Sequence, residues 1–336
     1  MGAYAQNISV SAKAAVLVIA DTGEVIYEKN AYEKLPMAST TKIMTSLLAL
    51  ESGERRKTIK VTDEMVAVEG TSMGLKADDT VSVENLVYGM LLQSGNDAAN
   101  VTAAVLSKGK SFSDMMNERA KEIGMTNTNF VTPSGLDSKD HYSCAYDMAL
   151  LAAEALKNPE FKHICSKTNA TISYGNPPYL RTLSNHNRLL RECEGCVGVK
   201  TGFTKKSGRC LVSAVERNGS LLIAVTLNAP NDWNDHKRLY DYGFAKVQTK
   251  TLSYDLSDYE FKVVGGEKDS ISVKLMNNPT VTVKEDNIEA KVFIEHFEYA
   301  PVKKGDTVGY VRYFYKDKII EEVPVITTEA VNLSAV

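Results

Sequence analysis

The chain has little of what would place it in several common protein classes. Its 336 residues include only five cysteines, too few and too scattered for a disulfide framework in a chain of this size. With 39 basic against 42 acidic residues it has no excess of positive charge to neutralise phosphates, which argues against a nucleic-acid partner. Its longest apolar stretch near the start, residues 14–20, is too short to span a bilayer and predicts a buried strand.

Neither end of the chain carries a recognisable targeting signal. Met1-Gly2-Ala3-Tyr4 lacks the basic and apolar regions of a signal peptide, and residues 331–336 lack an anchor. The chain is therefore either cytoplasmic or the mature form of an exported protein, and the choice has to come from its function.

One pair of cysteines is closely spaced, as Cys193-x-x-Cys196. A zinc site would need two more ligands, and only His186, Cys165 and Cys210 lie nearby in sequence. No second pair of this spacing exists, so incidental or structural thiols are the favoured interpretation, with a disulfide and a metal site as alternatives. We predict no metal and no other cofactor.

The periodicity of apolar residues predicts an α+β fold. Strands are expected at residues 14–20, 25–29, 197–204, 210–216 and 221–227. Helices are expected at residues 39–50, 145–156 and 233–244, and the stretch 83–123 predicts three more, broken at 94–96 and around Gly109. We expect strands from the two ends of this region to pair in one antiparallel sheet, with the helices segregated from it.

The pattern changes near residue 249. Short alternating runs at residues 270–275, 280–284, 290–295 and 308–315 are separated by turn residues and predict a small all-β domain. We therefore expect one domain over residues 1–248 and a second over residues 249–336.

Three short polar clusters supply the parts of a serine acyl-transfer site that moves protons with lysine. Ser39-Thr40-Thr41-Lys42 opens the first predicted helix, where Lys42 lies one turn after Ser39 on the same face and can act as its base. Ser94-Gly95-Asn96 breaks two helices and offers a hydroxyl for proton relay and a carboxamide. Lys200-Thr201-Gly202 lies in a predicted strand, with a cation for a carboxylate and a glycine that lets a ligand approach.

Two similar patterns have simpler interpretations. Ser107 and Lys110 repeat the serine–lysine spacing but run into Gly109, which predicts a solvated helix end. Gly70-Thr71-Ser72-Met73-Gly74 fits the nucleophile elbow of α/β-hydrolases, which requires a strand before it and a helix directly after it. A polar loop at residues 75–80 follows instead, so a serine–histidine–aspartate enzyme is a remote alternative.

In this order the clusters match the motifs of penicillin-recognising serine enzymes. The match extends to residues 38–45, 94–99 and 198–204. The chain resembles the low-molecular-weight penicillin-binding proteins that are D-alanyl-D-alanine carboxypeptidases over residues 10–245, and its β-rich tail is similar to the C-terminal domain of that family. The resemblance implies a penicillin-binding/β-lactamase-like catalytic domain followed by a small β domain.

The resemblance also implies a role for each matching residue. Ser39 would attack the carbonyl of the penultimate D-alanine of a peptidoglycan stem peptide, with Lys42 as base. Ser94 would pass the proton to the leaving nitrogen, and Asn96 would orient Lys42 and the substrate amide. Water would then hydrolyse the acyl-enzyme, and β-lactams would trap the same serine.

Substrate binding is implied for the strand of the third cluster. Lys200 and Thr201 would hold the terminal carboxylate, Gly202 would lie beside them, and the amide of Phe203 would complete the oxyanion site with the amide of Ser39. Phe203 replaces a histidine common in the family and leaves the substrate preference open. Arg188 and Arg238 are candidates for assisting carboxylate recognition.

Two rival functions share parts of this pattern. A serine β-lactamase of the fast-deacylating type needs a glutamate-bearing loop between the second and third clusters, and residues 130–137 contain no glutamate. A non-catalytic penicillin-sensing or wall-binding module would need no base, so a complete serine and lysine set argues against it.

The expected partners follow from the implied reaction. They are the pentapeptide stems of peptidoglycan as substrates and β-lactam antibiotics as covalent inhibitors. Because this substrate lies outside the cytoplasmic membrane, we expect an exported enzyme whose native signal peptide has been removed. Association with the membrane surface through a segment absent from this chain is a further expectation.

Overall fold

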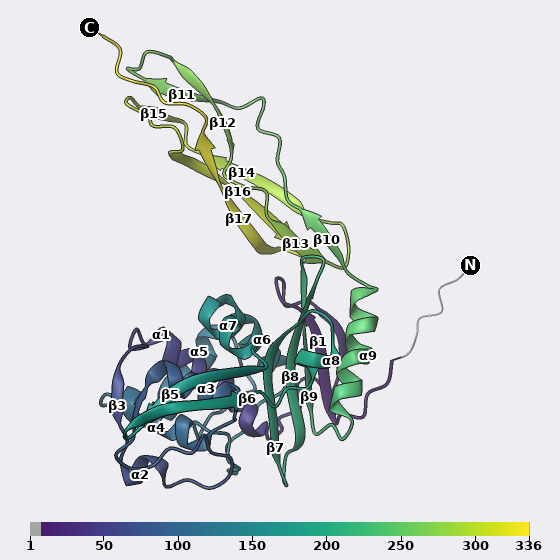
Figure 1. Cartoon of the computed structure of the whole chain (residues 1–336). Coiled ribbons are helices and arrows are strands. Elements are labelled where there is room, and N and C mark those ends of the chain that lie inside the picture. The colour runs from purple at the N-terminus through teal and green to yellow at the C-terminus, as the bar shows by residue number, and fades with distance from the viewer. Residues whose placement is uncertain (1–7, 336) are drawn as a thin grey trace. The chain divides into compact units, whose positions relative to one another are not determined.

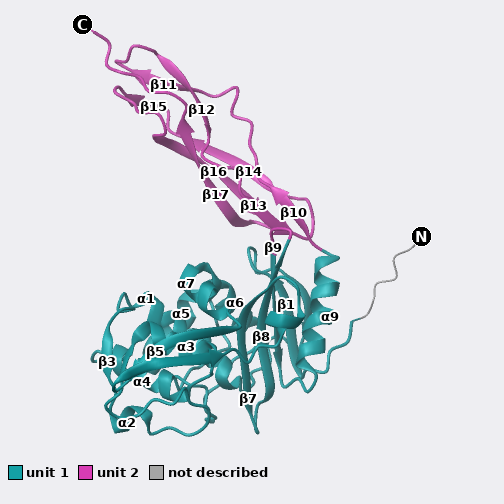
Figure 2. Ribbon diagram, viewed as in Figure 1, with its two compact units in different colours: residues 1–217, 221–246 teal, residues 218–220, 247–336 magenta. Residues whose placement is uncertain are grey.

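The chain forms two compact units, which this computed structural model describes over residues 8–335 (Figures 1 and 2). Unit 1 comprises residues 1–217 and 221–246, and unit 2 comprises residues 218–220 and 247–336. Met1-Gly2-Ala3-Tyr4, on which the expectation about a signal peptide rests, lies outside the described residues.

The main sheet of unit 1 joins strands from the two ends of its sequence. Its order is β2-β1-β9-β8-β7, so β1 of the early hairpin lies beside the late strand β9 in antiparallel register. The bounds are β1 Ala14–Ile19, β2 Val25–Lys29, β7 Cys196–Thr204, β8 Gly208–Arg217 and β9 Ser220–Leu227. The expected pairing of early and late strands is confirmed, and the chain has the predicted α+β class.

Helices form the rest of unit 1 (Figure 1). They are α1 Lys42–Glu51, α2 Asp63–Val66, α3 Val83–Leu91, α4 Asn96–Leu106, α5 Phe112–Ile123, α6 Ala145–Lys157, α7 Pro159–Cys165, α8 Leu189–Glu192 and α9 Asp232–Phe244. One apolar core joins them to the sheet, because buried side chains such as Val16 on β1, Met44 on α1 and Met148 on α6 belong to one cluster.

A second sheet in unit 1 was not predicted from the sequence. It has the order β3-β4-β5-β6, with β3 Thr58–Lys60, β4 Thr80–Ser82, β5 Asn169–Gly175 and β6 Pro178–Ser184. These strands are short or bury only a few side chains, such as Ile172, Tyr174 and Leu183, so they carry a weak periodic signal. The end of β6 leads directly into the active-site region through His186.

The predicted helix over residues 39–50 is wrong at its start. Residues Ala38–Thr41 form a 3₁₀ turn, η1, and the α-helix begins only at Lys42. The hydroxyls of Thr40 and Thr41 donate to the carbonyl oxygens of Met37 (2.6 Å) and Ala38 (2.8 Å). Such side-chain bonds to nearby carbonyls compete with the α-helical pattern, which accounts for the tighter turn.

Unit 2 is all-β, as predicted. Its larger sheet has the order β14-β16-β17-β12-β11-β15, and β10 pairs with β13. The strands are β10 Gln248–Thr251, β11 Glu260–Val264, β12 Ser270–Leu275, β13 Thr280–Val283, β14 Glu289–Ile294, β15 Phe297–Tyr299, β16 Thr307–Tyr315 and β17 Lys318–Thr327. The sequence indicated β12, β13, β14 and β16, but not the other strands. A core of its own, including Phe261, Val311 and Val325, lies within the unit.

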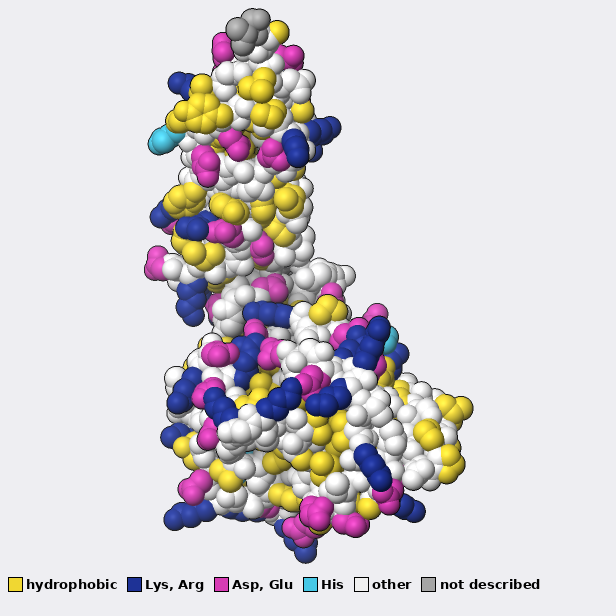
Figure 3. All heavy atoms as spheres, turned by 90° about the vertical axis from the view of Figure 1, so that its left-hand side faces the viewer, with side chains coloured by type: hydrophobic (Ala, Val, Ile, Leu, Met, Phe, Trp, Pro, Cys, Tyr) yellow, Lys and Arg dark blue, Asp and Glu magenta, His cyan; other side chains and the backbone are white. Residues whose placement is uncertain are grey.

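On the face drawn in Figure 3, acidic and basic side chains are interspersed rather than gathered by sign. Within the described part of the chain, no helix has the length and apolar character needed to cross a bilayer.

Candidate active site

Ser39 and Lys42 meet at the junction of η1 and α1. Because residues three apart eclipse each other in a 3₁₀ turn, the Lys42 side chain returns to Ser39. Lys42 Nζ lies 2.9 Å from Ser39 Oγ. Ser39 is partly exposed, whereas Lys42 is fully buried.

The amine of Lys42 has two further neighbours, and both are oxygens that only accept. It donates to Asn96 Oδ1 (2.7 Å) and to the carbonyl oxygen of Ser134 (2.6 Å). Asn96 Nδ2 donates to the carbonyl of Glu69 (2.7 Å), which fixes the amide so that its oxygen faces Lys42. A neutral Lys42 amine would thus donate its two N–H groups to these oxygens and direct its lone pair at the Ser39 hydroxyl.

Burial makes that neutral form accessible. Loss of solvation, aided by repulsion from the Lys200 charge, lowers the pKa of Lys42 well below its usual value, while Asp97 opposes the shift. The direction is the one a lysine base requires.

The second cluster is held in a strained turn before α4. Ser94 has a φ of +59°, in the left-handed region that costs a non-glycine residue about 1–3 kcal/mol. A side chain at Gly95 would meet Asp97 Oδ1 at 2.7 Å and the Met73 amide nitrogen at 3.0 Å. Gly95 therefore gives Asp97 room to bind the loop around Met73.

Asp97 binds this loop through its backbone amides. The buried carboxylate accepts from the amides of Met73 (3.0 Å), Gly74 (3.1 Å) and Leu75 (3.0 Å). It also accepts from Ser72 Oγ at 2.6 Å. Ser72 is thereby part of a loop and not of a strand–turn–helix elbow, which removes the hydrolase alternative.

The third cluster lies on β7 at the edge of the main sheet. Lys200 is buried, and its Nζ donates to Ser94 Oγ (3.0 Å) and to the carbonyl of Thr201 (2.8 Å). Burial lowers the pKa of Lys200 to about 7. The second and third clusters are thus joined by one hydrogen bond, as the first and second are joined through Lys42 and Asn96.

The backbone of another element approaches Gly202 closely. A side chain there would lie 3.0 Å from the carbonyl oxygen of Met37 and 3.1 Å from the amide nitrogens of Ser39 and Thr40. The backbone of η1 therefore lies close to its α-carbon, and Gly202 also lines the cavity described next. The glycine brings the serine turn against β7.

A cavity of about 260 Å³ opens over this constellation. Ser39, Ser94, Thr201, Gly202 and Phe203 line it, and Lys42, Asn96 and Lys200 are not part of its lining. Phe203 is 65% exposed.

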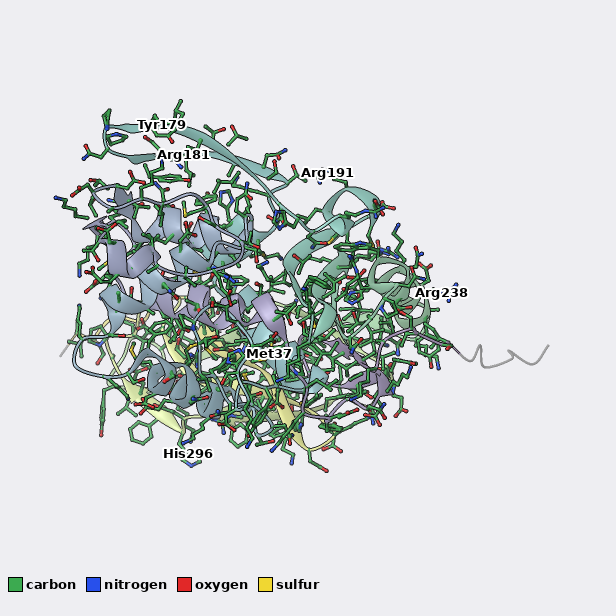
Figure 4. The ribbon with its side chains drawn as sticks, turned by 90° about the horizontal axis from the view of Figure 1, so that it is seen from below. Met37, Tyr179, Arg181, Arg191, Arg238 and His296 are labelled. Carbon is green, nitrogen blue, oxygen red and sulfur yellow. The ribbon has the colours of Figure 1, made fainter. Side chains whose placement is uncertain are left out.

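Sequence reasoning missed several lining residues: Thr71, His186, Arg209, Cys210, Asp232 and Trp233. Arg209 stands directly opposite Phe203 in the β7–β8 register. The short turn after Thr204 could have indicated this position, since it fixes the hairpin register. Arg188 pairs with Glu192 (2.6 Å), and its guanidinium carbon lies 5.9 Å from the centre of the Trp233 ring, which lines the cavity. Figure 4 shows Arg238 at the outer edge of the view, away from Met37, which directly precedes η1.

The loop over residues 130–137 reaches the site, although it carries no glutamate. Besides the Ser134 carbonyl on Lys42, the carbonyl of Pro133 accepts from Thr45 Oγ1 (2.6 Å). His141 Nδ1 accepts from the Val131 amide (2.9 Å), so its Nε2–H donates to Thr41 Oγ1 (2.8 Å). His141 thereby ties this loop to the turn that carries Ser39.

The remaining candidates lie apart from this chemistry. Ser107 Oγ donates to the carbonyl of Ala103 (2.6 Å), and Lys110 pairs with Glu118. Cys193 and Cys196 are free thiols whose pKa values burial raises. Among residues 8–335, no three His, Cys, Asp or Glu side chains come together as metal ligands.

Comparison with known proteins agrees with the geometry. The sequence model of the D-alanyl-D-alanine carboxypeptidase family matches residues 2–231, and that of the C-terminal domain of penicillin-binding protein 5 matches residues 248–333. The D-alanyl-D-alanine carboxypeptidase DacF of Bacillus subtilis is 32% identical over 350 residues, covering 98% of this chain and 88% of the relative. DacC of Escherichia coli is 35% identical over 347 residues, covering 96% and 85%.

Solved structures give the same result. DacD from Francisella tularensis superposes with a TM-score of 0.69 at 27% identity, covering 99% of this chain and 97% of that one. Penicillin-binding protein 5 from Haemophilus influenzae gives 0.70 at 27% identity, covering 98% and 100%. The Streptomyces K15 DD-transpeptidase gives 0.67 at 29% identity, covering 71% of this chain and 98% of that one.

The resemblance seen in the sequence, the predicted fold class and the predicted enzyme class are confirmed. The chain belongs to the D-alanyl-D-alanine carboxypeptidase family of low-molecular-weight penicillin-binding proteins, and it is a serine-type peptidase.

Proposed function

We propose that Ser39 is the nucleophile and Lys42 the general base of this carboxypeptidase. The observation that carries the proposal is the setting of the Lys42 amine between two accepting oxygens and the Ser39 hydroxyl. In this setting the Ser39 O–H donates to the amine, which takes the proton as Oγ attacks the penultimate D-alanine carbonyl.

The second half of the acylation step needs a proton on the leaving nitrogen. Ser94 Oγ lies in the cavity wall and accepts from Lys200, so its own proton is available to the departing D-alanine. The proton that Lys42 took from Ser39 would then pass to Ser94, which leaves Ser94 as a hydroxyl and Lys42 as a neutral amine. The carbon–nitrogen bond breaks, D-alanine leaves, and Ser39 retains the acyl group. Attack by water then releases the shortened peptide and restores the Ser39 hydroxyl.

Substrate recognition is assigned to the edge strand. The amides of Ser39 and Phe203 would hold the oxyanion, and Thr201 and Lys200 would bind the terminal carboxylate, with Gly202 keeping the two walls together. Asn96 would orient Lys42 and the substrate amide. β-Lactams would acylate Ser39 in place of the peptide.

The same proposal assigns the chemistry to one part of the chain. Residues 1–248 would form the catalytic domain and residues 249–336 a separate β-rich domain. Because peptidoglycan stems lie outside the cytoplasmic membrane, the enzyme would act on the outer side of that membrane.

A two-substrate experiment tests the function. Incubation with a D-Ala-D-Ala peptide should release D-alanine, and penicillin should leave a long-lived adduct. Rapid penicillin turnover would instead indicate a β-lactamase, and an adduct without peptide cleavage a sensor. Ser39→Ala should abolish both reactions, whereas Ser107→Ala, in the second serine–lysine pair, should leave both unchanged.

A further inference from the structure

We propose that a pocket on the outward face of the unit 2 sheet binds the glycan strand of peptidoglycan, a chain of β-1,4-linked N-acetylated sugars. All residues of the pocket belong to unit 2, so the proposal goes beyond the reaction assigned to Ser39. Only the source of the glycan rests on the proposed function, since peptidoglycan carries both the stem peptides and this sugar chain.

The pocket has a volume of about 400 Å³, which is in the range of small-molecule sites, and lies beside the turn that joins β16 to β17. The half-buried ring of Phe314 supplies an aromatic surface. The other lining side chains are polar or charged: Asn287, Glu289, Lys291, Lys316 and Asp317. One aromatic surface with several polar groups around it suits a sugar better than an apolar ligand.

A pyranose ring has two kinds of surface that match this lining. Its C–H groups form an apolar face that packs on an aromatic ring, and its hydroxyl and acetamido groups project from the edge and need hydrogen-bond partners. Glu289 and Asp317 offer carboxylates that accept from hydroxyl groups. Asn287 and Lys291 offer N–H groups that donate to hydroxyl and acetamido oxygens.

The sheet continues the pocket toward a second group of rings. Residues directly opposite each other on neighbouring strands share a face, so Phe314 of β16 lies on the same face as Glu289 of β14. Phe293, Tyr310 and Pro324 form another row of this face, four residues further along β14 and β16. Phe293 is 46% and Tyr310 41% exposed. The two rows are about 14 Å apart, so a ligand that reaches both must be an extended chain.

Charged side chains between the two rows hold the rings and leave the face without an excess charge. Lys291 Nζ lies 5.1 Å from the centre of the Phe314 ring, and the guanidinium carbon of Arg312 lies 4.9 Å from that of Phe293. Arg312 also pairs with Glu322. The pocket and this face carry three basic and three acidic side chains: Lys291, Arg312, Lys316, Glu289, Asp317 and Glu322. Such a balance does not suit an anionic membrane or a nucleic acid, and it suits a largely uncharged polymer.

Titration of the full chain with a tetrasaccharide of β-1,4-linked N-acetylglucosamine tests the site. This probe has the linkage and acetamido groups of the glycan but no stem peptide, and penicillin is added first to close the site of Ser39. We expect saturable binding by isothermal titration calorimetry. The double variant Phe293→Ala/Tyr310→Ala should weaken it about 10-fold through the lost ring contacts. Glu289→Gln, which removes a charge and keeps the shape, should weaken it about 3-fold.

Tyr299→Ala is the matched control, because Tyr299 is 67% exposed on β15, at the opposite edge of the same sheet. It should bind the tetrasaccharide as the wild type does. Thermal melting establishes that each variant is folded, and Glu289→Gln alone decides the matter if the double variant is not. Purified peptidoglycan should sediment the penicillin-treated wild type and less of the double variant.

Several results would overturn the glycan site. They are the absence of tetrasaccharide binding by the wild type, equal binding by the wild type and the folded variants, and peptidoglycan sedimentation that the variants leave unchanged. Binding of anionic phospholipid vesicles in place of the sugar, lost in the double variant, would assign the face to a lipid surface instead. Failure of penicillin to acylate Ser39 would count against the proposed function and not against this face, since the tetrasaccharide contains no stem peptide.

Discussion

Two buried lysines lie in one site, and their surroundings give them different tasks. Lys42 has two accepting oxygens and one hydroxyl around its amine, a setting that suits a neutral base. Lys200 has one hydroxyl and one carbonyl, and its pKa is lowered to about 7. Repulsion between the two favours a state in which only one of them is charged.

The pH dependence of kcat/KM should show the different protonation states of Lys42 and Lys200. As pH falls below the lowered pKa of Lys42, the base is protonated and the rate should drop. As pH rises through about 7, Lys200 loses its charge and carboxylate binding should weaken. A profile without an acid limb would contradict Lys42 as base.

Asn96→Asp tests the setting of Lys42 directly. The change keeps the shape but places a carboxylate 2.7 Å from the amine, which should raise the pKa of Lys42 and keep it protonated. We expect kcat/KM at pH 7 to fall about 10- to 1,000-fold, since such a pair shifts a pKa by about 1–3 units. The acid limb should also move to higher pH. Asn85→Asp, where the side chain bonds the Ser173 carbonyl, is the control; an unshifted limb in Asn96→Asp would refute the account.

At the scale of elements, the segments that carry the three motifs could be predicted from the sequence. The residues that pack or hydrogen-bond against those segments could not. The second and third clusters lie where the sequence placed them, at the start of α4 and on a late strand, because each changes a strong apolar period. The first cluster lies mostly in the turn η1, just before α1, rather than in the first turn of an α-helix. Arg209, Asp232 and Trp233 escaped prediction, since they reach the cavity only through the β7–β8 register and the first turn of α9. Asp97 lies within a recognised motif, but its hydrogen bonds to the loop could not be predicted, because the loop residues are more than twenty positions away in the sequence.

The turn η1 packs closely against β7 because Gly202 has no side chain. Gly202→Ala would place a methyl group 3.0–3.1 Å from Met37 O and the amides of Ser39 and Thr40. The turn must shift, so we expect a loss of about 1–3 kcal/mol in unfolding free energy. Acylation by penicillin should slow about 100-fold, because small displacements of reacting groups are costly.

Substitution of a second glycine, Gly124, is the control that distinguishes a loss of stability from a loss of catalytic rate. Gly124 ends α5 with a φ of +90°, and a β-carbon added there would meet no atom within 4 Å. Gly124→Ala should therefore lose about 1 kcal/mol through backbone strain alone and keep its acylation rate. If both variants lost stability but neither lost rate, the close approach would have no catalytic purpose.

At the scale of the whole molecule, each unit has its own core. The apolar cluster of unit 1 contains no described residue beyond Leu227, and that of unit 2 begins at Leu252. The boundary expected near residue 248 rested on a change from long helical periods to short alternating runs. The other strands of unit 2 were missed because polar and apolar residues do not alternate regularly along them.

Catalysis should survive removal of unit 2. The Streptomyces K15 enzyme is covered almost completely by 71% of this chain, so a protein of that length folds and carries the same architecture. We expect residues 1–246 to keep kcat/KM within a few-fold of the full chain on a soluble D-Ala-D-Ala peptide. Circular dichroism would establish that the shortened chain is folded; a folded but inactive protein would show that unit 2 takes part in the chemistry.

The measurement that tests the central claim most directly is the location of the penicillin adduct. Trypsin releases residues 35–42, a peptide with three adjacent hydroxyl side chains at Ser39, Thr40 and Thr41. Tandem mass spectrometry of the full-length protein after penicillin should place the acyl group on Ser39 in stoichiometric amount, with no adduct in Ser39→Ala and a normal one in Ser107→Ala. An adduct on Thr40, on Ser94 or on the Ser107 segment would contradict the assignment of Ser39 as the nucleophile.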